Sequence, residues 1–313
     1  MAKISIIGAG FVGTSTAFSL LMKRVASEIA IVDINKEKAE GEALDLKNGL
    51  VFTESTKITH SDKYDITKNS DIVIITAGAN QKPGETRLDL VNKNALILEG
   101  IIKNLLKYEK KDTVYMMIAN PVDILTFVAK KMIPNSENRV FGTGTSLDTA
   151  RLRHYLSENL NVNPRNVHVY VLGEHGDSSF PTWSSAYISV TPLLKHDGVN
   201  QKLLDAAYTK TKNSAYEIIS KKGATYYAIA LTATHICDAI LSDSREIMAA
   251  STIPTKYGIK DVSLSVPCVI GRKGIYQQQV IPMSASEKKL LIKSQKVLKE
   301  YTDKALKAIK NKK

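Results

Sequence analysis

The sequence KISIIGAGFVG, residues 3–13, joins a short apolar run to a glycine-rich turn and the start of a helical pattern. Gly8, Gly10 and Gly13 have the GxGxxG spacing, which allows a tight turn, close approach of a pyrophosphate, and close packing of helix on strand. Asp33, 20 residues after Gly13, lies at the end of the next apolar run. A carboxylate there accepts hydrogen bonds from ribose hydroxyls and repels a 2′-phosphate, so these residues predict an NAD site.

Apolar runs alternate with helical patterns through the first half of the chain. The runs KISIIG, EIAIVDI, DIVIITAG and TVYMMIAN precede helical patterns that begin near residues 12, 36, 88 and 122. Such alternation predicts βαβ crossovers and a Rossmann-type, doubly wound parallel sheet of the α/β class. The segment TAGAN would add backbone from Gly78 and Ala79 to the cofactor site at the carboxyl edge of that sheet.

The pattern changes after about residue 165. NVHVYVLG predicts a strand, residues 202–221 and 225–241 predict helices, and residues 245–282 predict strands with GRKG as their turn. We therefore expect an NAD-binding domain over residues 1–145 and a mixed α+β substrate-binding domain over residues 146–313.

The net charge of +12 is concentrated near the C-terminus, since +7 of it lies in residues 287–313. Apolar residues recur there at steps of three and four, which predicts an amphipathic helix with lysines on its solvated face. The apolar residues are Leu290, Val297, Leu298, Tyr301, Leu306 and Ile309. Because no nucleic-acid fingerprint accompanies the lysines, we expect no nucleic-acid partner, although a polyanion-binding protein that only retains the fold stays an alternative.

The apolar runs and the cysteines further limit the class of protein and the kinds of site that the chain can have. The chain of 313 residues has no apolar run of the 18 or so residues needed to span a bilayer, and its first residues lack a signal-peptide pattern. Cys237 and Cys268 have no CxxC spacing and no histidine cluster beside them. We expect a cytoplasmic protein with no membrane partner and no metal site.

Two further segments carry acid–base and anion-binding side chains. GEHGDSS places His175 just after a strand, and histidine is the natural proton donor or acceptor near neutral pH. LDTARLR supplies Asp148, which can orient the imidazole, and Arg151 three residues later on the same helical face. This set suits reduction of a 2-keto acid whose carboxylate is held by the arginine fork.

Six segments in order resemble the lactate/malate dehydrogenase family, specifically its bacterial L-lactate dehydrogenases of the fructose-1,6-bisphosphate-activated type. They are GAGFVG, AGANQKPGETRLDL, NPVDIL, LDTARLR, GEHGDSS and KKGATYY. The resemblance implies that His175 is the acid/base, that Asp148 is its partner, and that Arg151 binds the substrate carboxylate. It also implies that Arg87, on a mobile loop, polarises the substrate carbonyl. Further implied contacts are Asn120 with nicotinamide and substrate, Thr225 with substrate, and Val12, Lys38 and Tyr64 with the adenosine half of the cofactor.

Gln81 bears on which acid is reduced. Malate dehydrogenase relatives carry arginine at that position, which pairs with the second carboxylate of oxaloacetate. A neutral Gln81 leaves that charge uncompensated, so pyruvate and L-lactate are expected as the substrate pair. Lys82 beside it keeps malate or another 2-hydroxy acid open as an alternative.

The resemblance also implies regulation and assembly. Arg153 is two residues after Arg151, about 200° around the helix, and so points away from the substrate. Arg153 and His168 match residues that bind fructose-1,6-bisphosphate between subunits of the activated enzymes. A homotetramer acting at the end of fermentative glycolysis is therefore expected.

Overall fold

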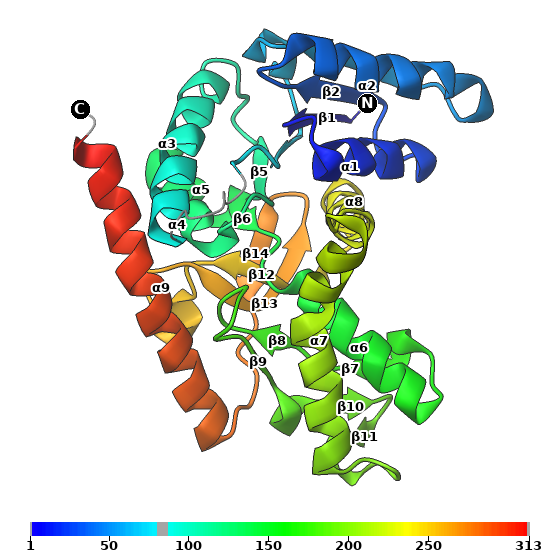
Figure 1. Cartoon of the computed structure of the whole chain (residues 1–313), viewed down its shortest axis with the longest axis vertical. Coiled ribbons are helices and arrows are strands. Elements are labelled where there is room, and N and C mark those ends of the chain that lie inside the picture. Colours follow the sequence, from blue (N-terminus) through cyan, green and yellow to red (C-terminus); the bar gives the residue numbers. More distant parts are fainter. Residues whose placement is uncertain (1, 80–86, 312–313) are drawn as a thin grey trace.

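The computed structural model describes residues 2–79 and 87–311, with Arg87 described by its backbone alone. Within these ranges a nine-stranded sheet in the order β14-β13-β12-β6-β5-β4-β1-β2-β3 runs through the middle of the molecule (Figure 1). Strands β1 to β6 pair in parallel, and β12, β13 and β14 continue the sheet in antiparallel pairing. The bounds are β1 (Lys3–Ile7), β2 (Glu28–Val32), β3 (Lys57–Ser61), β4 (Ile72–Ile75), β5 (Val114–Met117), β6 (Val140–Gly142), β12 (Glu246–Thr252), β13 (Leu264–Gly271) and β14 (Gly274–Gln278).

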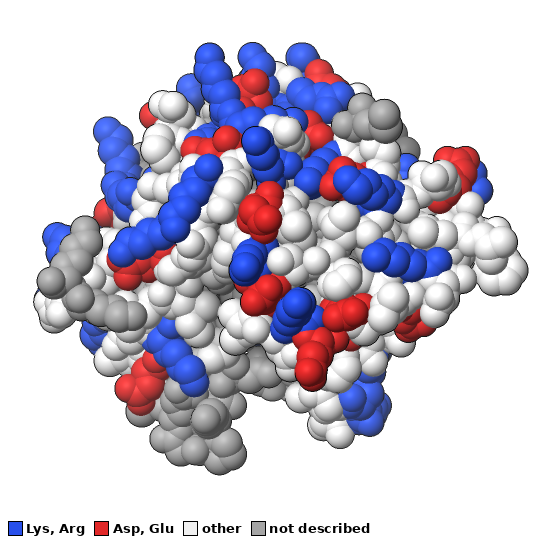
Figure 2. Space-filling model, turned by 90° about the horizontal axis from the view of Figure 1, so that it is seen from above, with Lys and Arg blue, Asp and Glu red and all other residues white. Residues whose placement is uncertain are grey.

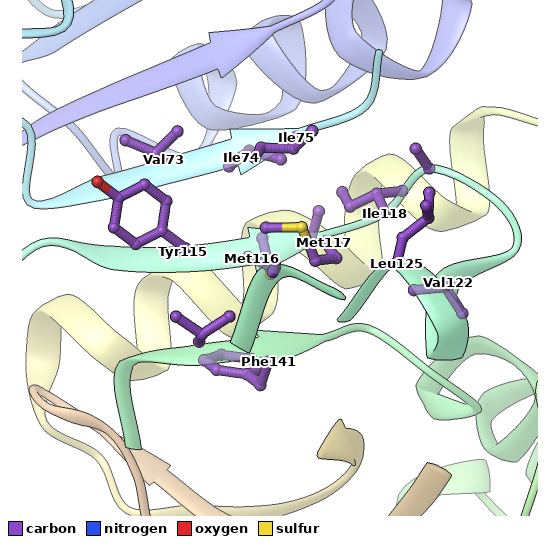
Figure 3. Packing of buried hydrophobic residues seen from close by; sticks show 14 of the residues in the cluster. Val73, Ile74, Ile75, Tyr115, Met116, Met117, Ile118, Val122, Leu125 and Phe141 are labelled. Carbon is purple, nitrogen blue, oxygen red and sulfur yellow. The ribbon is translucent and has the colours of Figure 1, made fainter. Parts of the chain in front are cut away.

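The predicted parallel α/β sheet is confirmed, and its helices begin close to the expected residues. The central strands β4 and β5 are buried along their whole length, as continuous apolar runs in a two-sided sheet should be. Figure 3 shows buried side chains of β5 lying between those of β4 and Phe141 of β6. The helices of this half are α1 (Phe11–Met22), α2 (Lys36–Asn48), α3 (Arg87–Leu105), α4 (Val122–Met132) and α5 (Ser136–Arg139).

The antiparallel strands of the second half do not form a separate sheet. Ser251 of β12 pairs with Gly142 of β6, so the strands predicted for residues 245–282 extend the N-terminal sheet. A Cβ on Gly142 would lie 2.4 Å from Thr126 Oγ1 and 3.2 Å from Ser251 Cβ, so only glycine fits at this junction. One buried apolar cluster consequently extends from Ile4 to Ala305.

The prediction of a single strand for NVHVYVLG is wrong. It divides into β7 (Val167–His168) and β8 (Val171–Leu172), which belong to different small sheets. At the break, Arg153 donates to the carbonyl of Val169, and Thr182 donates to that of Tyr170, so these groups are satisfied away from a continuous ladder. The remaining short strands are β9 (Phe180–Pro181), β10 (Tyr187–Ile188) and β11 (Thr191–Pro192).

The last helices are α6 (Ser146–Leu160), α7 (Gln201–Lys222), α8 (Tyr227–Ser242) and α9 (Ala285–Asn311). The long helix α9 lies along α3 and α4 at the edge of the molecule (Figure 1). The prediction that Leu298 lies on the buried apolar face of α9 is confirmed. Near the start of the helix the prediction is wrong by one residue, because Leu291 is buried whereas Leu290 is 39% exposed. On the side of the molecule seen in Figure 2, Lys and Arg alternate with Asp and Glu.

Candidate active site

The glycine-rich turn forms an open cradle between β1 and α1. Gly8 has φ +109°, and a Cβ on Gly13 would lie 1.9 Å from the Gly8 carbonyl oxygen, so both positions demand glycine. A Cβ on Gly10 would meet nothing within 4 Å. No side chain caps α1 and no acid lies in its first turn, so its first N–H groups face this open space. The cradle fits the pyrophosphate of a dinucleotide.

Asp33 is fixed beside the same turn. Its Oδ2 accepts a 2.6 Å hydrogen bond from the Ala9 N–H, and its Oδ1 accepts one of 2.9 Å from Asn35 N–H. Burial, and next the charge of Asp33, raise the pKa of Tyr64, so this phenol lies close to the carboxylate. Val12 is partly buried at the start of α1, whereas Lys38 is exposed in the first turn of α2. Asp33 and Tyr64 thus share one side of the cradle.

A buried amide that the sequence analysis missed holds the next two loops together. Asn94 of α3 is 2% exposed. It accepts from Ala79 N–H at 2.7 Å and donates to the carbonyls of Ala79 and Asn120. The loop after β4, which includes Gly78, is thereby tied to the loop after β5 at the carboxyl edge of the sheet, where ligands of doubly wound folds bind.

His175, Asp148 and Arg151 form one hydrogen-bonded cluster. The Nδ1 of His175 donates to Asp148 Oδ2 at 2.6 Å, and Arg151 Nη1 donates to Asp148 Oδ1 at 3.1 Å. The charge of Asp148 is the largest cause that raises the pKa of His175, to about 9, against the opposing effect of burial. Burial alone would raise the pKa of Asp148, but the charges and hydrogen bonds of His175 and Arg151 lower it. The imidazole is therefore cationic at pH 7 and can deliver a proton.

These three side chains line a cavity of about 420 Å³. Asn120 and Pro121 close it on the side of the parallel sheet. Helix α7 forms the opposite wall with Tyr208, Thr211, Lys212, Ala215, Tyr216 and Ile219. The cavity thus combines a cationic acid, an arginine fork and a wall that includes the apolar side chains of Ala215 and Ile219, which suits a small carboxylate with a short apolar group.

One other predicted substrate residue, Thr225, does not line this cavity. It is half-buried between α7 and α8. Gln81 lies outside the described residues, and so does the side chain of Arg87.

Arg153 faces away from the cluster, as its rotation around α6 predicts. It lines a second cavity of about 500 Å³ together with His154, Arg165 and Tyr170, and its guanidinium lies 5.6 Å from the centre of the Tyr170 ring. Burial lowers the pKa of Arg153. His168 is exposed on β7 and does not line this cavity within the chain.

Residues 2–79 and 87–311 contain neither a cluster of metal-ligating side chains nor a helix that could span a membrane. No group of three or more His, Cys, Asp or Glu side chains there has the arrangement of a metal site. None of the helices there is both long and apolar enough to cross a membrane.

Two family models, one after the other, together match nearly the whole chain. The NAD binding domain of lactate/malate dehydrogenases matches residues 2–142, and the alpha/beta C-terminal domain of the same family matches residues 145–309. The predicted cofactor, NAD, is therefore confirmed.

Individual relatives agree over nearly their whole length. L-lactate dehydrogenase 1 of Clostridium acetobutylicum is 46% identical over 307 residues, 96% of this chain and 97% of that protein. An L-lactate dehydrogenase of Clostridium botulinum is 45% identical over 309 residues, 97% of this chain and 96% of that protein.

Two solved structures are also similar over nearly the whole chain. A lactate dehydrogenase from a Medee basin deep-sea metagenome superposes with TM-score 0.93 and 37% identity, covering 97% of this chain and 98% of the other. The minor L-lactate dehydrogenase of Enterococcus mundtii superposes with TM-score 0.93 and 39% identity, covering 96% of this chain and 98% of the other. The chain belongs to the lactate/malate dehydrogenase family, whose members are NAD-dependent oxidoreductases.

Proposed function

We propose that this chain is an L-lactate dehydrogenase that interconverts pyruvate and L-lactate. The observation that carries the proposal is the cluster of His175, Asp148 and Arg151 in one cavity of about 420 Å³. Residues 1–145 hold the cofactor and residues 146–313 supply most of the substrate pocket.

His175 supplies the proton. Its Nδ1–H is engaged by Asp148, which leaves Nε2–H as the donor to the keto oxygen of pyruvate. Asp148 fixes the ring orientation and stabilises the imidazolium before transfer. Because the pKa of His175 is about 9, pyruvate reduction should decline as pH rises through that value while lactate oxidation increases.

Arg151 holds the substrate carboxylate. One of its nitrogens is engaged by Asp148, and its remaining N–H groups form a fork for two hydrogen bonds to a carboxylate. We assign the Arg87 side chain to the keto oxygen and Asn120, which lines the cavity, to a contact with the substrate.

The glycine cradle, Asp33 and Tyr64 would hold NAD, with Val12 and Lys38 at the adenosine end. When bound, the reduced cofactor supplies the hydride for the keto carbon. The chain's own contribution is to orient substrate and cofactor side by side and to exclude water around them.

The cradle gives a matched pair of variants. Gly10→Ala should fold as wild type, because its Cβ meets nothing within 4 Å, yet bind NADH about tenfold more weakly because the methyl group enters the phosphate space. Gly13→Ala should also bind NADH more weakly, and in addition its free energy of unfolding should fall by about 3 kcal/mol, because the new Cβ overlaps the Gly8 carbonyl oxygen. Thermal unfolding and fluorescence titration with NADH measure both effects. Wild-type NADH affinity in Gly10→Ala would place the pyrophosphate elsewhere.

Substrate choice is tested by initial rates of NADH oxidation with pyruvate and with oxaloacetate. We expect kcat/KM to favour pyruvate by at least about tenfold, because Gln81 offers no positive charge to a second carboxylate. A preference for oxaloacetate would overturn the assignment of Gln81 and make the chain a malate dehydrogenase.

We also propose a cytoplasmic homotetramer, active at the end of fermentative glycolysis and activated by fructose-1,6-bisphosphate. Exposed apolar side chains on and beside α1 support an assembly that covers them: Phe18 is 56% and Phe52 is 87% exposed. Arg153 and His168 from two subunits would supply cations for the two phosphates.

Regulation is tested with Arg153→Gln. The bisphosphate should lower the KM of the wild-type enzyme for pyruvate. The variant should lose that response, because one phosphate group of the activator no longer has the Arg153 guanidinium to bind it. Glu158→Gln, exposed on the same helix, is the control that keeps the response. An unchanged response in Arg153→Gln would move the activator site elsewhere.

A further inference from the structure

We propose that Ser294, on the C-terminal helix α9, is a positioning residue for the loop of residues 173–178, the histidine loop, which carries His175. This inference rests on the proposed function. Ser294 is fully buried. Its Oγ accepts a 2.7 Å hydrogen bond from Glu174 N–H and donates one of 3.0 Å to the carbonyl oxygen of Ser178. One hydroxyl of α9 therefore binds the main chain on both sides of His175.

The hydroxyl of Ser178 completes this network of hydrogen bonds. It donates a 2.5 Å hydrogen bond to Glu174 Oε2, because a carboxylate can only accept. The two serine Oγ atoms lie 2.8 Å apart. Since the Ser178 proton is used toward Glu174, the Ser294 proton is shared between the carbonyl and hydroxyl oxygens of Ser178. Glu174 is 2% exposed, so the network lies away from bulk water.

The position of Ser294 on α9 shows that its hydroxyl serves the loop rather than the helix. Leu291 and Leu298, three residues before and four residues after it, are buried in the large apolar cluster. A hydroxyl on such a face costs free energy unless it is hydrogen-bonded. Without it, the Glu174 N–H would lose the partner that the structure gives it, a penalty of about 1–3 kcal/mol.

Gly173 allows the histidine loop to approach α9 this closely. Its φ is +88°, and a Cβ there would lie 2.5 Å from Ser294 Oγ, so only glycine fits. Gly173 also exchanges two main-chain hydrogen bonds with Ser265 of β13, of 3.1 and 2.9 Å. The loop therefore begins at a fixed point on β13 and contacts α9 one residue later, directly before His175.

The histidine loop supplies part of the wall of the substrate cavity. His175, Gly176 and Asp177 line that cavity, whereas Ser294 does not. Asp148 orients the His175 ring, while Ser294 holds the main chain before and after it. A displacement of about 1 Å between reacting groups can cost about 10²-fold in rate. Ser294 therefore acts on the reaction only through the position of His175.

The test is Ser294→Ala, with hydride transfer followed in single turnovers by stopped flow. The rate of hydride transfer should fall about tenfold, because the histidine loop loses its contact with α9 and His175 spends less time aligned with the substrate. NADH affinity and the KM for pyruvate should stay close to wild type, because the glycine cradle and Arg151 are unchanged. A wild-type rate, or a loss confined to KM, would overturn the proposal.

Thr302→Val is the matched control. Thr302 is on the same helix and is 1% exposed, and its hydroxyl has no hydrogen-bond partner among the described residues. Valine keeps the shape of threonine, so this variant also loses only a buried hydroxyl of α9. It should transfer hydride at the wild-type rate. An equal fall in Thr302→Val would make the effect one of helix packing and contradict the assignment to Ser294.

A second variant changes the network without changing α9. Ser178→Ala removes the donor to the Glu174 carboxylate and one neighbour of the Ser294 hydroxyl, but leaves the Glu174 N–H bound to Ser294. The rate of hydride transfer should fall about threefold, less than in Ser294→Ala, because the loop keeps part of its contact with α9. A larger loss in Ser178→Ala than in Ser294→Ala would place the anchor of the loop elsewhere.

A spectroscopic readout separates this inference from the proposed function. The Nδ1 proton of His175, in its 2.6 Å hydrogen bond to Asp148, should give a downfield proton NMR resonance, which His175→Asn assigns by its absence. The resonance should shift or broaden in Ser294→Ala and stay in place in Thr302→Val. If wild type fails to reduce pyruvate, the proposed function fails, but the resonance still tests Ser294. An unchanged resonance in Ser294→Ala would refute its role.

Discussion

The His175→Asn variant is expected to lose about 10³-fold or more in kcat for pyruvate reduction while binding NADH as wild type does. Asparagine fills similar space and offers hydrogen bonds, but it cannot deliver a proton, and general acid catalysis contributes about 10²–10⁴-fold. Gly8, Gly10 and Gly13 of the cradle do not line the cavity that holds His175 and Asp148. Stopped-flow single turnovers, with NADH affinity measured by fluorescence, separate the two effects.

His196→Asn serves as the control for this loss. His196 is half-buried, and its Nδ1 is hydrogen-bonded to the carbonyl of Asp197, outside the substrate cavity. It should keep wild-type kcat. Turnover by His175→Asn above about a tenth of wild type would mean that another group supplies the proton.

The Arg151→Gln variant is expected to lose about 10³-fold in kcat/KM for pyruvate, mostly through a higher KM. Two charge-assisted hydrogen bonds to the carboxylate are lost, each of about 1.5–3 kcal/mol. Arg151→Lys should recover only part of the loss, because a point charge does not reproduce the planar fork. Steady-state kinetics over a wide range of pyruvate concentration measure the split between KM and kcat.

An arginine on the far surface controls for a general effect of charge. Arg24 is exposed and pairs with Glu54 at 2.7 Å, so Arg24→Gln should leave the kinetics as in wild type. If Arg151→Gln reduced pyruvate with unchanged KM, another cation would have to bind the carboxylate.

Local patterns predicted the parallel half of the molecule well. Continuous apolar runs such as DIVIITAG mark strands buried on both faces, and the glycine spacing marks the turn after β1. The pairing of Asp148 with His175 was also expected, because the motifs LDTARLR and GEHGDSS bring complementary groups.

Features that depend on tertiary contacts could not be predicted in the same way. Asn94 ends the polar run NKN in α3 and Asp123 lies in the first turn of α4, and only the fold shows what these two side chains contact. The junction of β12 with β6 depends on the fit of Ser251 against Gly142, which leaves no periodic signal. The break between β7 and β8 and the exposure of Leu290 were also not predicted, because both depend on tertiary contacts rather than on local sequence patterns.

The central claim is that this chain transfers a hydride directly to pyruvate while His175 provides the proton. The most direct measurement is incubation of the enzyme with pyruvate and NADH that carries deuterium at both hydrogen positions of nicotinamide C4, followed by chiral analysis and mass spectrometry of the product. The account predicts L-lactate with one deuterium at C2. Lactate without deuterium, or the D enantiomer, would contradict it.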